Sequence, residues 1–212
     1  MHAVSIISQL SRRVVGVFGV TFNGISETSK KIFKALTHAS TPYFSKPFIY
    51  ALIVSAVIIF VSLTYGASRG NQVEIEVADQ VVAEIETLAS ESTWFSIFIN
   101  NVGLTLVTFI PLIGAVWMIF VQYNTGWYLG AIAKAYNVDY IIATSIILTS
   151  IVGLFEYVAY IIALGESMNL SYSATQRGFM ERLIQHSWKS IIVVVSLLFI
   201  GGVIESFLLG NL

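Results

Sequence analysis

The sequence contains no cysteine and few charged residues, and both shortages restrict the classes of protein to which it can belong. The absence of cysteine excludes disulfides, thiol nucleophiles and thiolate metal sites together. Charged residues make up only 11% of the 212 positions, whereas a soluble domain carries roughly a quarter. Hydrophobic residues reach 56%, and the mean hydropathy is +0.81. We therefore predict an all-α, multi-pass membrane protein.

The sequence also lacks the motifs of common catalytic and cofactor sites. HExxH, GxSxG, a P-loop and the paired aspartates of intramembrane proteases are all absent. His2, His38 and His186 are too scattered along the chain to suggest a metal site. We therefore predict no catalytic residue, no metal and no cofactor, and an intramembrane enzyme is kept only as a third alternative.

One apolar stretch, residues 94–136, dominates the sequence and is interrupted once, by Pro111. It is too long for one membrane crossing and long enough for two. We predict a hairpin of spans at about 94–110 and 112–136 that turns near Pro111. A re-entrant element over the same residues is the alternative.

Three further apolar runs bring the predicted number of transmembrane helices to five. They cover about residues 48–67, 140–164 and 189–209. Each is long enough to cross the hydrocarbon layer as a helix. The predicted five-helix transmembrane domain is therefore 47–212.

Three charged segments carry apolar residues at helical spacing and predict amphipathic helices. Residues 1–46 are basic and predict interfacial helices in the headgroup layer, or helices packed on the cytoplasmic face of the protein itself. Residues 72–90 are acidic and predict an outer helix that either caps the bundle or forms a binding surface. Residues 172–188 are basic and predict an inner helix. Anionic lipid explains both basic segments better than nucleic acid does.

The distribution of charge predicts the orientation of the spans. Six lysines and arginines lie in the first 46 residues, and three lie between residues 165 and 189. Segment 68–93 holds Arg69 as its one basic residue. By the positive-inside rule, the N-terminus and the 165–189 loop are cytoplasmic, and the acidic segment and the C-terminus are outside. We therefore predict a multi-pass protein of the plasma membrane.

Several polar side chains lie within the predicted spans, where an unpaired amide or carboxylate is costly. At about 1.5 Å of rise per residue, Asn100, Asn101 and Asn124 share one depth, and Glu156 lies about one turn below them. We predict a midplane polar hub of these four residues. The hub either holds the helices together or lines a path for a proton, an ion or a solute.

Two charged residues near the outer ends of spans predict a second contact. Lys134 and Glu205 are candidates for an ion pair, although Lys134 reaches the interface or Asp139 equally well. The same depth calculation separates Glu205 from Glu156 by about 15 Å. We therefore do not expect these two carboxylates to form a pair.

Small residues predict where helices approach one another closely. Gly126 and Gly130 form a GxxxG pair, which permits either close packing of another helix or dimerisation. Gly153 is predicted as a further packing position.

Several short motifs follow one another from residue 98 onward: FINN at 98–101, a Pro–Leu turn with Gly114, YNTGWYLG at 123–130, GLFEYVA at 153–159 and IESF at 204–207. This order of motifs resembles the stage II sporulation protein M family of integral membrane proteins. Two positions depart from the pattern of the family: Thr125 separates Asn124 from Gly126, and Val152 stands where a histidine is common. The resemblance covers about residues 94–209. It implies a membrane scaffold that anchors cell-wall-degrading partners in sporulating bacteria, although relatives also occur in organisms that never sporulate.

These observations together predict a non-enzymatic scaffold or subunit of a cell-envelope membrane complex. The predicted partners are the lipid bilayer, anionic lipid at the basic segments, and other proteins or further copies of the chain. A transport or channel subunit with a polar midplane path is the alternative.

Overall fold

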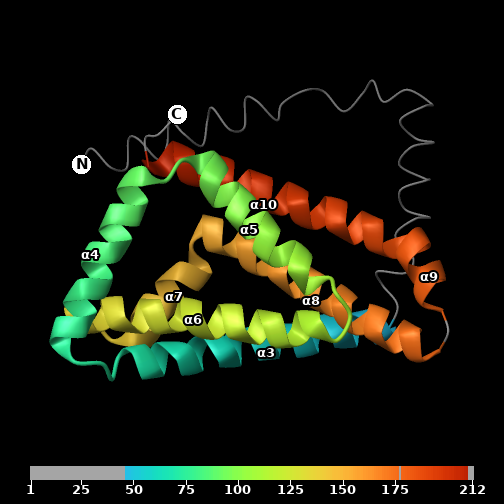
Figure 1. The fold of residues 1–212 in the computed structure, drawn as a ribbon, viewed down its shortest axis with the longest axis horizontal. Coiled ribbons are helices and arrows are strands. Elements are labelled where there is room, and N and C mark those ends of the chain that lie inside the picture. The colour runs from blue at the N-terminus through green and yellow to red at the C-terminus, as the bar shows by residue number, and fades with distance from the viewer. Residues whose placement is uncertain (1–45, 177, 210–212) are drawn as a thin grey trace, which may run out of the picture. The chain divides into compact units, whose positions relative to one another are not determined.

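The computed structural model describes residues 46–176 and 178–209, which form helices joined by short turns (Figure 1). The predicted interfacial helices of residues 1–46 lie outside the described residues, apart from Lys46. In chain order the elements are α3 (Lys46–Gly70), α4 (Ile75–Glu91), α5 (Trp94–Thr108), α6 (Ile113–Ala135), α7 (Tyr140–Thr149), α8 (Ile151–Thr175), α9 (Phe179–Arg182), the π-helical turn η3 (Leu183–Ser187) and α10 (Trp188–Leu209).

Three helical stretches in the described part of the chain are long and apolar enough to cross a membrane. They are Lys46–Gly70, Ile151–Thr175 and the continuous stretch Phe179–Glu205. Helices α5 and α7 are apolar but have only 15 and 10 residues. At about 1.5 Å per residue, α5 is about 22 Å long, which is shorter than the hydrocarbon layer of about 30 Å. Five complete crossings therefore remain a prediction.

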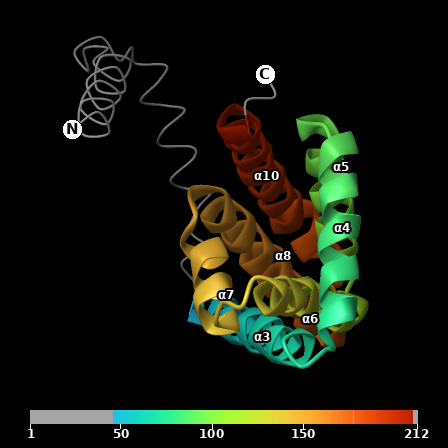
Figure 2. The ribbon, with the colours of Figure 1, turned by 90° about the vertical axis from the view of Figure 1, so that its left-hand side faces the viewer.

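Helix α8 is the centre of the arrangement. It packs against α3, α5, α6, α7 and α10, and Figure 2 shows it between α10 and the α3–α6 pair. The most deeply buried large side chains include Ile59, Met118, Leu164 and Leu198. Because these come from α3, α6, α8 and α10, one apolar core joins all four long helices.

Contacts between residues far apart in sequence fix the relative directions of the helices. Gly66 lies against Tyr123 and Gly70 against Trp127, so α3 and α6 run parallel. The hydrogen-bonded pairs Asn101–Glu156 and Ser167–Ile110 likewise make α5 and α8 parallel.

Helix α10 runs opposite to α8 and α5. A Cβ added at Gly201 would lie 3.4 Å from the Phe155 Cβ, while Ser187 bonds Glu166 further along the same pair of helices. Since a tight turn joins α5 to α6, the helices α3, α5, α6, α8 and α10 alternate in direction along the chain. This alternation is what five successive crossings require.

Backbone-to-backbone packing joins α3 to α6. A Cβ placed on Gly66 or Gly70 would overlap the carbonyls of α6, and one placed on Gly126 or Gly130 would overlap the carbonyls of α3. Each helix therefore contributes a GxxxG pair to one interface, which is the arrangement that lets two helices approach closely. The predicted GxxxG face of α6 is occupied by α3 of the same chain.

The turn between α5 and α6 contains Pro111, as the sequence predicts. Leu112 adopts a positive φ of 66°, and the Ile113 N–H donates to the Pro111 carbonyl at 2.8 Å. The turn is held on α8 by two serines: the Leu112 N–H donates to Ser171 Oγ at 2.9 Å, and Ser167 Oγ donates to the Ile110 carbonyl at 3.1 Å. Ser171 thus satisfies the Leu112 N–H, and Ser167 is a second donor to the Ile110 carbonyl, which also accepts the Gly114 N–H at 2.7 Å.

The predicted continuous span at 140–164 is wrong, because the chain leaves the helical conformation at Ser150 (φ −63°, ψ 150°). Ser150 ends α7 and caps α8, and its Oγ accepts a hydrogen bond from the Gly153 N–H at 3.0 Å. A Cβ at Gly153 would overlap the Ile147 carbonyl at the end of α7. Gly153, a predicted packing position, therefore lies where the start of α8 meets the end of α7.

Candidate functional site

The interior polar residues come together between α5, α8 and α10. Asn101 Nδ2 of α5 donates to Glu156 Oε1 of α8 at 2.7 Å. Glu205 of α10 is close enough to interact electrostatically with Glu156. The α10 backbone approaches at Gly201, where an added Cβ would lie 4.0 Å from the Glu156 Cγ. We call Asn101, Glu156 and Glu205 the acidic cluster.

Two tyrosines of α8 complete the surroundings of the acidic cluster. Tyr157 and Tyr160 are buried, with ring centroids 5.8 Å apart, and both follow Glu156 within about one turn of α8. The cluster therefore offers carboxylate oxygens and an amide within an otherwise apolar interface. Such groups can join three helices, and they can also accept a proton or a small cation.

The predicted separation of Glu156 from Glu205 is wrong, and the break at Ser150 is the reason. In one straight span from 140 to 164, Glu156 would lie beyond the middle of the helix. The structure instead places Glu156 in the second turn of α8. Because α8 runs opposite to α10, this turn lies beside the last turns of α10, which carry Glu205.

Two of the four residues of the predicted hub do not join the cluster. Asn100 is exposed, since it is one position away from Asn101 and so points to a different side of α5. Asn124 Nδ2 donates to the Phe120 carbonyl of its own helix at 2.7 Å. The buried face of α6 includes Gln122, and a residue two positions further is turned by about 200° around the helix. Equal depth therefore did not bring these side chains together.

The predicted ion pair between Lys134 and Glu205 is not formed. Lys134 is exposed at the end of α6, where it lines a recess of about 320 Å³ with Asn137 and Asp139. Asp139 Oδ1 instead accepts the Ile141 N–H at 2.7 Å and caps α7. Lys134 and Glu205 are kept apart because α6 packs on α3 and α4, whereas α10 packs on α8 and α5.

The ion pair that the described residues do contain lies at the opposite end of α8. Arg182 of α9 holds Glu166 with two hydrogen bonds, from Nε to Oε1 at 2.9 Å and from Nη2 to Oε2 at 2.7 Å. Ser187 Oγ donates to the same Oε1 at 2.8 Å. The Glu166 side chain is 1% exposed and that of Arg182 is 18% exposed. We call these three residues the Glu166 lock.

Sequence reasoning missed the Glu166 lock because Glu166 follows the end of the predicted span at residue 164 and looks like a loop residue. The available signal was the single carboxylate at the end of an apolar run, with an arginine sixteen positions later. The predicted basic helix 172–188 is also wrong in its bounds. Residues 172–175 are the last turn of α8, and α9 and η3 form a separate turn that directs Arg182 inward.

The predicted acidic helix 72–90 is present as α4, which packs on α6. Ala78 and Val81 are its buried residues, and Glu76, Asp79, Glu84 and Glu86 are exposed. None of these four carboxylates forms an ion pair with the residues that the structure describes.

Metal binding finds no support in the described ranges. No group of three or more histidine, aspartate or glutamate side chains in residues 46–176 and 178–209 is placed to hold a metal ion. Two buried side-chain polar atoms of the described residues lack a hydrogen-bond partner: Gln122 Oε1 and His186 Nδ1. The Gln122 amide nitrogen lies 3.4 Å from the Met118 sulfur.

Comparison with known proteins agrees with the sequence motifs. Residues 48–208 match the family model described as Stage II sporulation protein M. No curated protein and no solved structure matches the chain. The match begins in the first turn of α3 and ends in the last turn of α10, so it includes the acidic cluster, the Glu166 lock and the α3–α6 interface. The chain is therefore a multi-pass membrane protein that belongs to the stage II sporulation protein M family.

Proposed function

We propose that this chain is a non-enzymatic scaffold subunit of a cell-envelope membrane complex and that α4 is its contact surface for a partner protein. The observation that carries the proposal is the exposure of α4. Its buried residues, Ala78 and Val81, lie in its first half, and every residue from Glu86 to Ser90 is exposed. A helix whose only role was to cap the bundle would bury one face along its whole length.

The charge of α4 indicates the chemistry of the partner. Four exposed carboxylates without an ion pair among the described residues favour a partner with a basic surface. Leu88, which is 56% exposed and lies in the second half of α4 with Glu84 and Glu86, offers an apolar side chain to the same partner.

The interior of the bundle supports a static role. The α3–α6 interface is interlocked through backbone contacts at four glycines. Helices packed in this way cannot slide past each other without separating, because each backbone blocks the other. A fixed frame of this kind suits a protein that holds partners in place.

Topology is part of the proposal: five crossings, with the N-terminus in the cytoplasm and α4 outside the plasma membrane. The alternating helix directions and the charge distribution support it. Single cysteines at Ser90 and Thr175, both exposed positions, test it in a chain without native cysteine. Impermeant maleimide added to intact cells should label Ser90→Cys and leave Thr175→Cys unlabelled. Labelling of Thr175→Cys would contradict the orientation.

The scaffold role is tested by co-purification from native membranes in mild detergent. We expect the wild-type chain to retain a protein partner in stoichiometric amount and the variant Glu84→Lys/Glu86→Lys to lose it. Glu181→Lys reverses an exposed charge on α9 and serves as the matched control, which should keep the partner. Equal retention by all three chains, or no stoichiometric partner at all, would contradict the assignment of α4.

A transport or channel subunit is the second candidate, and the acidic cluster is the observation that favours it. The cluster lies beside the helix break at Ser150, and interrupted helices next to polar groups mark transport sites in many membrane proteins. Flux through proteoliposomes that is abolished by Glu156→Gln, without loss of thermal stability, would support this function over the scaffold.

A further inference from the structure

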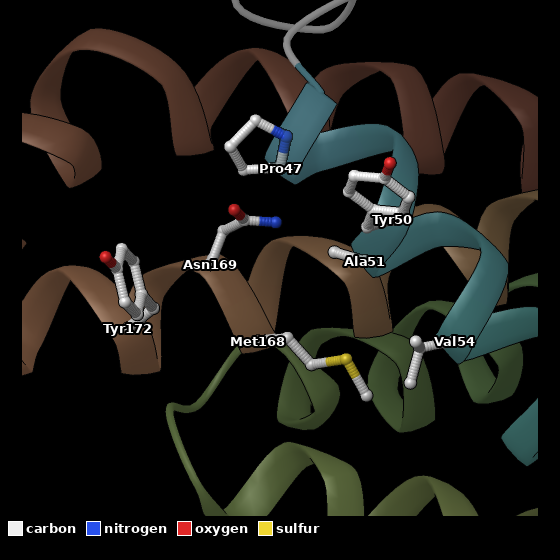
Figure 3. A pocket seen from close by; sticks show the side chains of 7 residues that line it. All are labelled: Pro47, Tyr50, Ala51, Val54, Met168, Asn169 and Tyr172. Carbon is white, nitrogen blue, oxygen red and sulfur yellow. The ribbon is translucent and has the colours of Figure 1, made fainter.

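A groove lies on the surface of the bundle, between the first turns of α3 and the last turns of α8. Its volume is about 360 Å³, and we call it the α3–α8 groove (Figure 3). It is lined by Pro47, Tyr50, Ala51 and Val54 of α3 and by Met168, Asn169 and Tyr172 of α8.

The crossing of the two helices closes one end of the groove. Gly165 packs directly on α3: a Cβ added there would lie 2.9 Å from Leu52 Cδ2 and 3.6 Å from Ser55 Oγ. Ser55 Oγ also lies 3.7 Å from the Met168 sulfur. Toward the start of α3, the groove-lining side chains Tyr50 and Tyr172 are each 65% exposed, whereas Phe48, which does not line the groove, is buried. The groove is therefore closed at an apolar inner end and open at the start of α3.

The open end of the groove carries polar groups that the described chain leaves unused. Asn169 is only 8% exposed, and its Nδ2 donates to the Gly165 carbonyl at 2.8 Å. Figure 3 shows its amide projecting from α8 toward Pro47. Within residues 46–176 and 178–209, no hydrogen bond reaches the Asn169 oxygen or the hydroxyls of Tyr50 and Tyr172.

The position of the groove indicates which kind of molecule meets it. Helix α3 is one of the candidate membrane spans and exposes its apolar side chains along the face that carries the groove, with Ile53 at 55% and Val54 at 48%. Tyrosines are typical of the boundary between hydrocarbon and headgroups. Lys46, which immediately precedes Pro47, is exposed and has no ion-pair partner in the described residues.

We propose that the α3–α8 groove is a binding site for an anionic glycerophospholipid. One acyl chain lies on the apolar floor formed by Ala51, Val54 and Met168. The headgroup region lies at the open end, where Asn169 accepts a hydrogen bond and Lys46 attracts the phosphate. A polar end and an apolar end in this order match the two ends of a phospholipid that stands in the bilayer beside α3.

The site is tested with the full-length chain in nanodiscs that contain a phosphatidylglycerol with a photoreactive acyl chain. Crosslinked peptides are mapped by mass spectrometry, and a phosphatidylcholine with the same acyl chain is the comparison lipid. We expect saturable labelling of the peptides that carry Val54 and Met168. We expect about fivefold stronger labelling by phosphatidylglycerol, which is the effect of one lysine near an anionic headgroup.

Two variants of α3 separate the groove from ordinary lipid contact. Val54→Trp fills the groove and should abolish saturable labelling. Val57→Trp adds the same side chain at a position that is 56% exposed on the same helix but does not line the groove, and it should leave the labelling unchanged. Labelling that rises in proportion to lipid content, is equal for both lipids, or survives Val54→Trp would overturn the proposal. Protection of the groove from both lipids by a second copy of the chain would overturn it as well.

Discussion

Removing the arginine of the Glu166 lock is expected to destabilise the protein strongly. The change Arg182→Met keeps the length of the apolar stem but leaves Glu166 with Ser187 as its one remaining donor from another side chain in the described chain. Because Glu166 is 1% exposed, water cannot replace the lost guanidinium without opening the turn between α8 and α10.

The expected size follows from the burial of the pair. Removing one partner of a buried ion pair costs about 3–5 kcal/mol, since an uncompensated charge stays behind. For a domain of this size each kcal/mol moves the melting temperature by about 2–4 °C, so Arg182→Met should melt about 6–20 °C below the wild type. Arg182→Lys keeps the positive charge but cannot donate two parallel hydrogen bonds to the Glu166 carboxylate. Its melting temperature should therefore lie between those of the wild type and Arg182→Met.

Removing the charge of Glu166 as well as that of Arg182 provides a more specific test than Arg182→Met alone. Glu166→Gln leaves a neutral side chain of the same shape and an arginine that is 18% exposed and can turn toward water. In Glu166→Gln/Arg182→Met no charge is left unpaired, so the double variant should be more stable than Arg182→Met alone. This non-additivity is expected because the two residues are in direct contact.

The assay is thermal unfolding of the purified chain in one detergent, followed by tryptophan fluorescence. Arg69→Met is the matched control, because Arg69 is exposed and bonds only Gln72 at 3.1 Å among the described residues. An Arg182→Met protein that melts within about 2 °C of the control, or additive effects in the double variant, would show that the lock contributes no more than a surface pair.

The remaining predictions use the same melting assay. Gly130→Ala should lower the free energy of unfolding by about 1–3 kcal/mol, because its Cβ would overlap the backbone of α3. Gly103→Ala has open space around it and should be neutral or stabilise the helix by about 0.5–1 kcal/mol. Equal effects of the two variants would refute the glycine interface. Asn101→Leu should lower stability by about 1–3 kcal/mol because Glu156 loses its amide donor, and an unchanged melting temperature would show that water or another group takes its place. Leu112→Gly should raise stability by up to about 1 kcal/mol, because a 75% exposed side chain at positive φ contributes more strain than packing, and a lower melting temperature would contradict this reasoning.

The elements that the sequence predicts correctly are those with a strong local signal. A proline in a long apolar stretch marks the turn at Pro111, and a regular apolar face with carboxylates between marks α4. Both signals come from residues within one or two turns of each other. The resemblance to the family rests on the order of short motifs, and the family match over residues 48–208 confirms it.

The break at Ser150 has no comparable signal, because serine is accepted inside membrane helices and also caps new ones. What decides between the two is the packing of α7 on α6 and α3, which the sequence does not display. A depth calculated along residues 140–164 as one straight helix is therefore wrong. The sequence therefore predicts Glu156 far from Glu205, whereas the structure places the two close enough to interact.

The partners of polar and small residues were the other part that could not be predicted. Gly126 and Gly130 stand out as a pair, but their counterpart, Gly66 and Gly70, lies where a predicted span meets a loop. Asn101 and Asn124 look equivalent by depth, yet only Asn101 lies on the face of its helix that meets α8. Depth along a helix follows from counting residues, whereas the direction of a side chain around the helix depends on its neighbours.

The parallel pairing of α3 with α6 also sets an order of events while the protein is being made. Gly66 meets Tyr123, about sixty residues later in the chain. At a synthesis rate of about 5–20 residues per second, α3 enters the membrane about 3–12 s before the surface that it fits has been translated. During that time its flat glycine face lies against lipid or the insertion machinery. A nascent chain that stops before Ile113 therefore has the first helix of the bundle but none of the helix that packs on its glycine face.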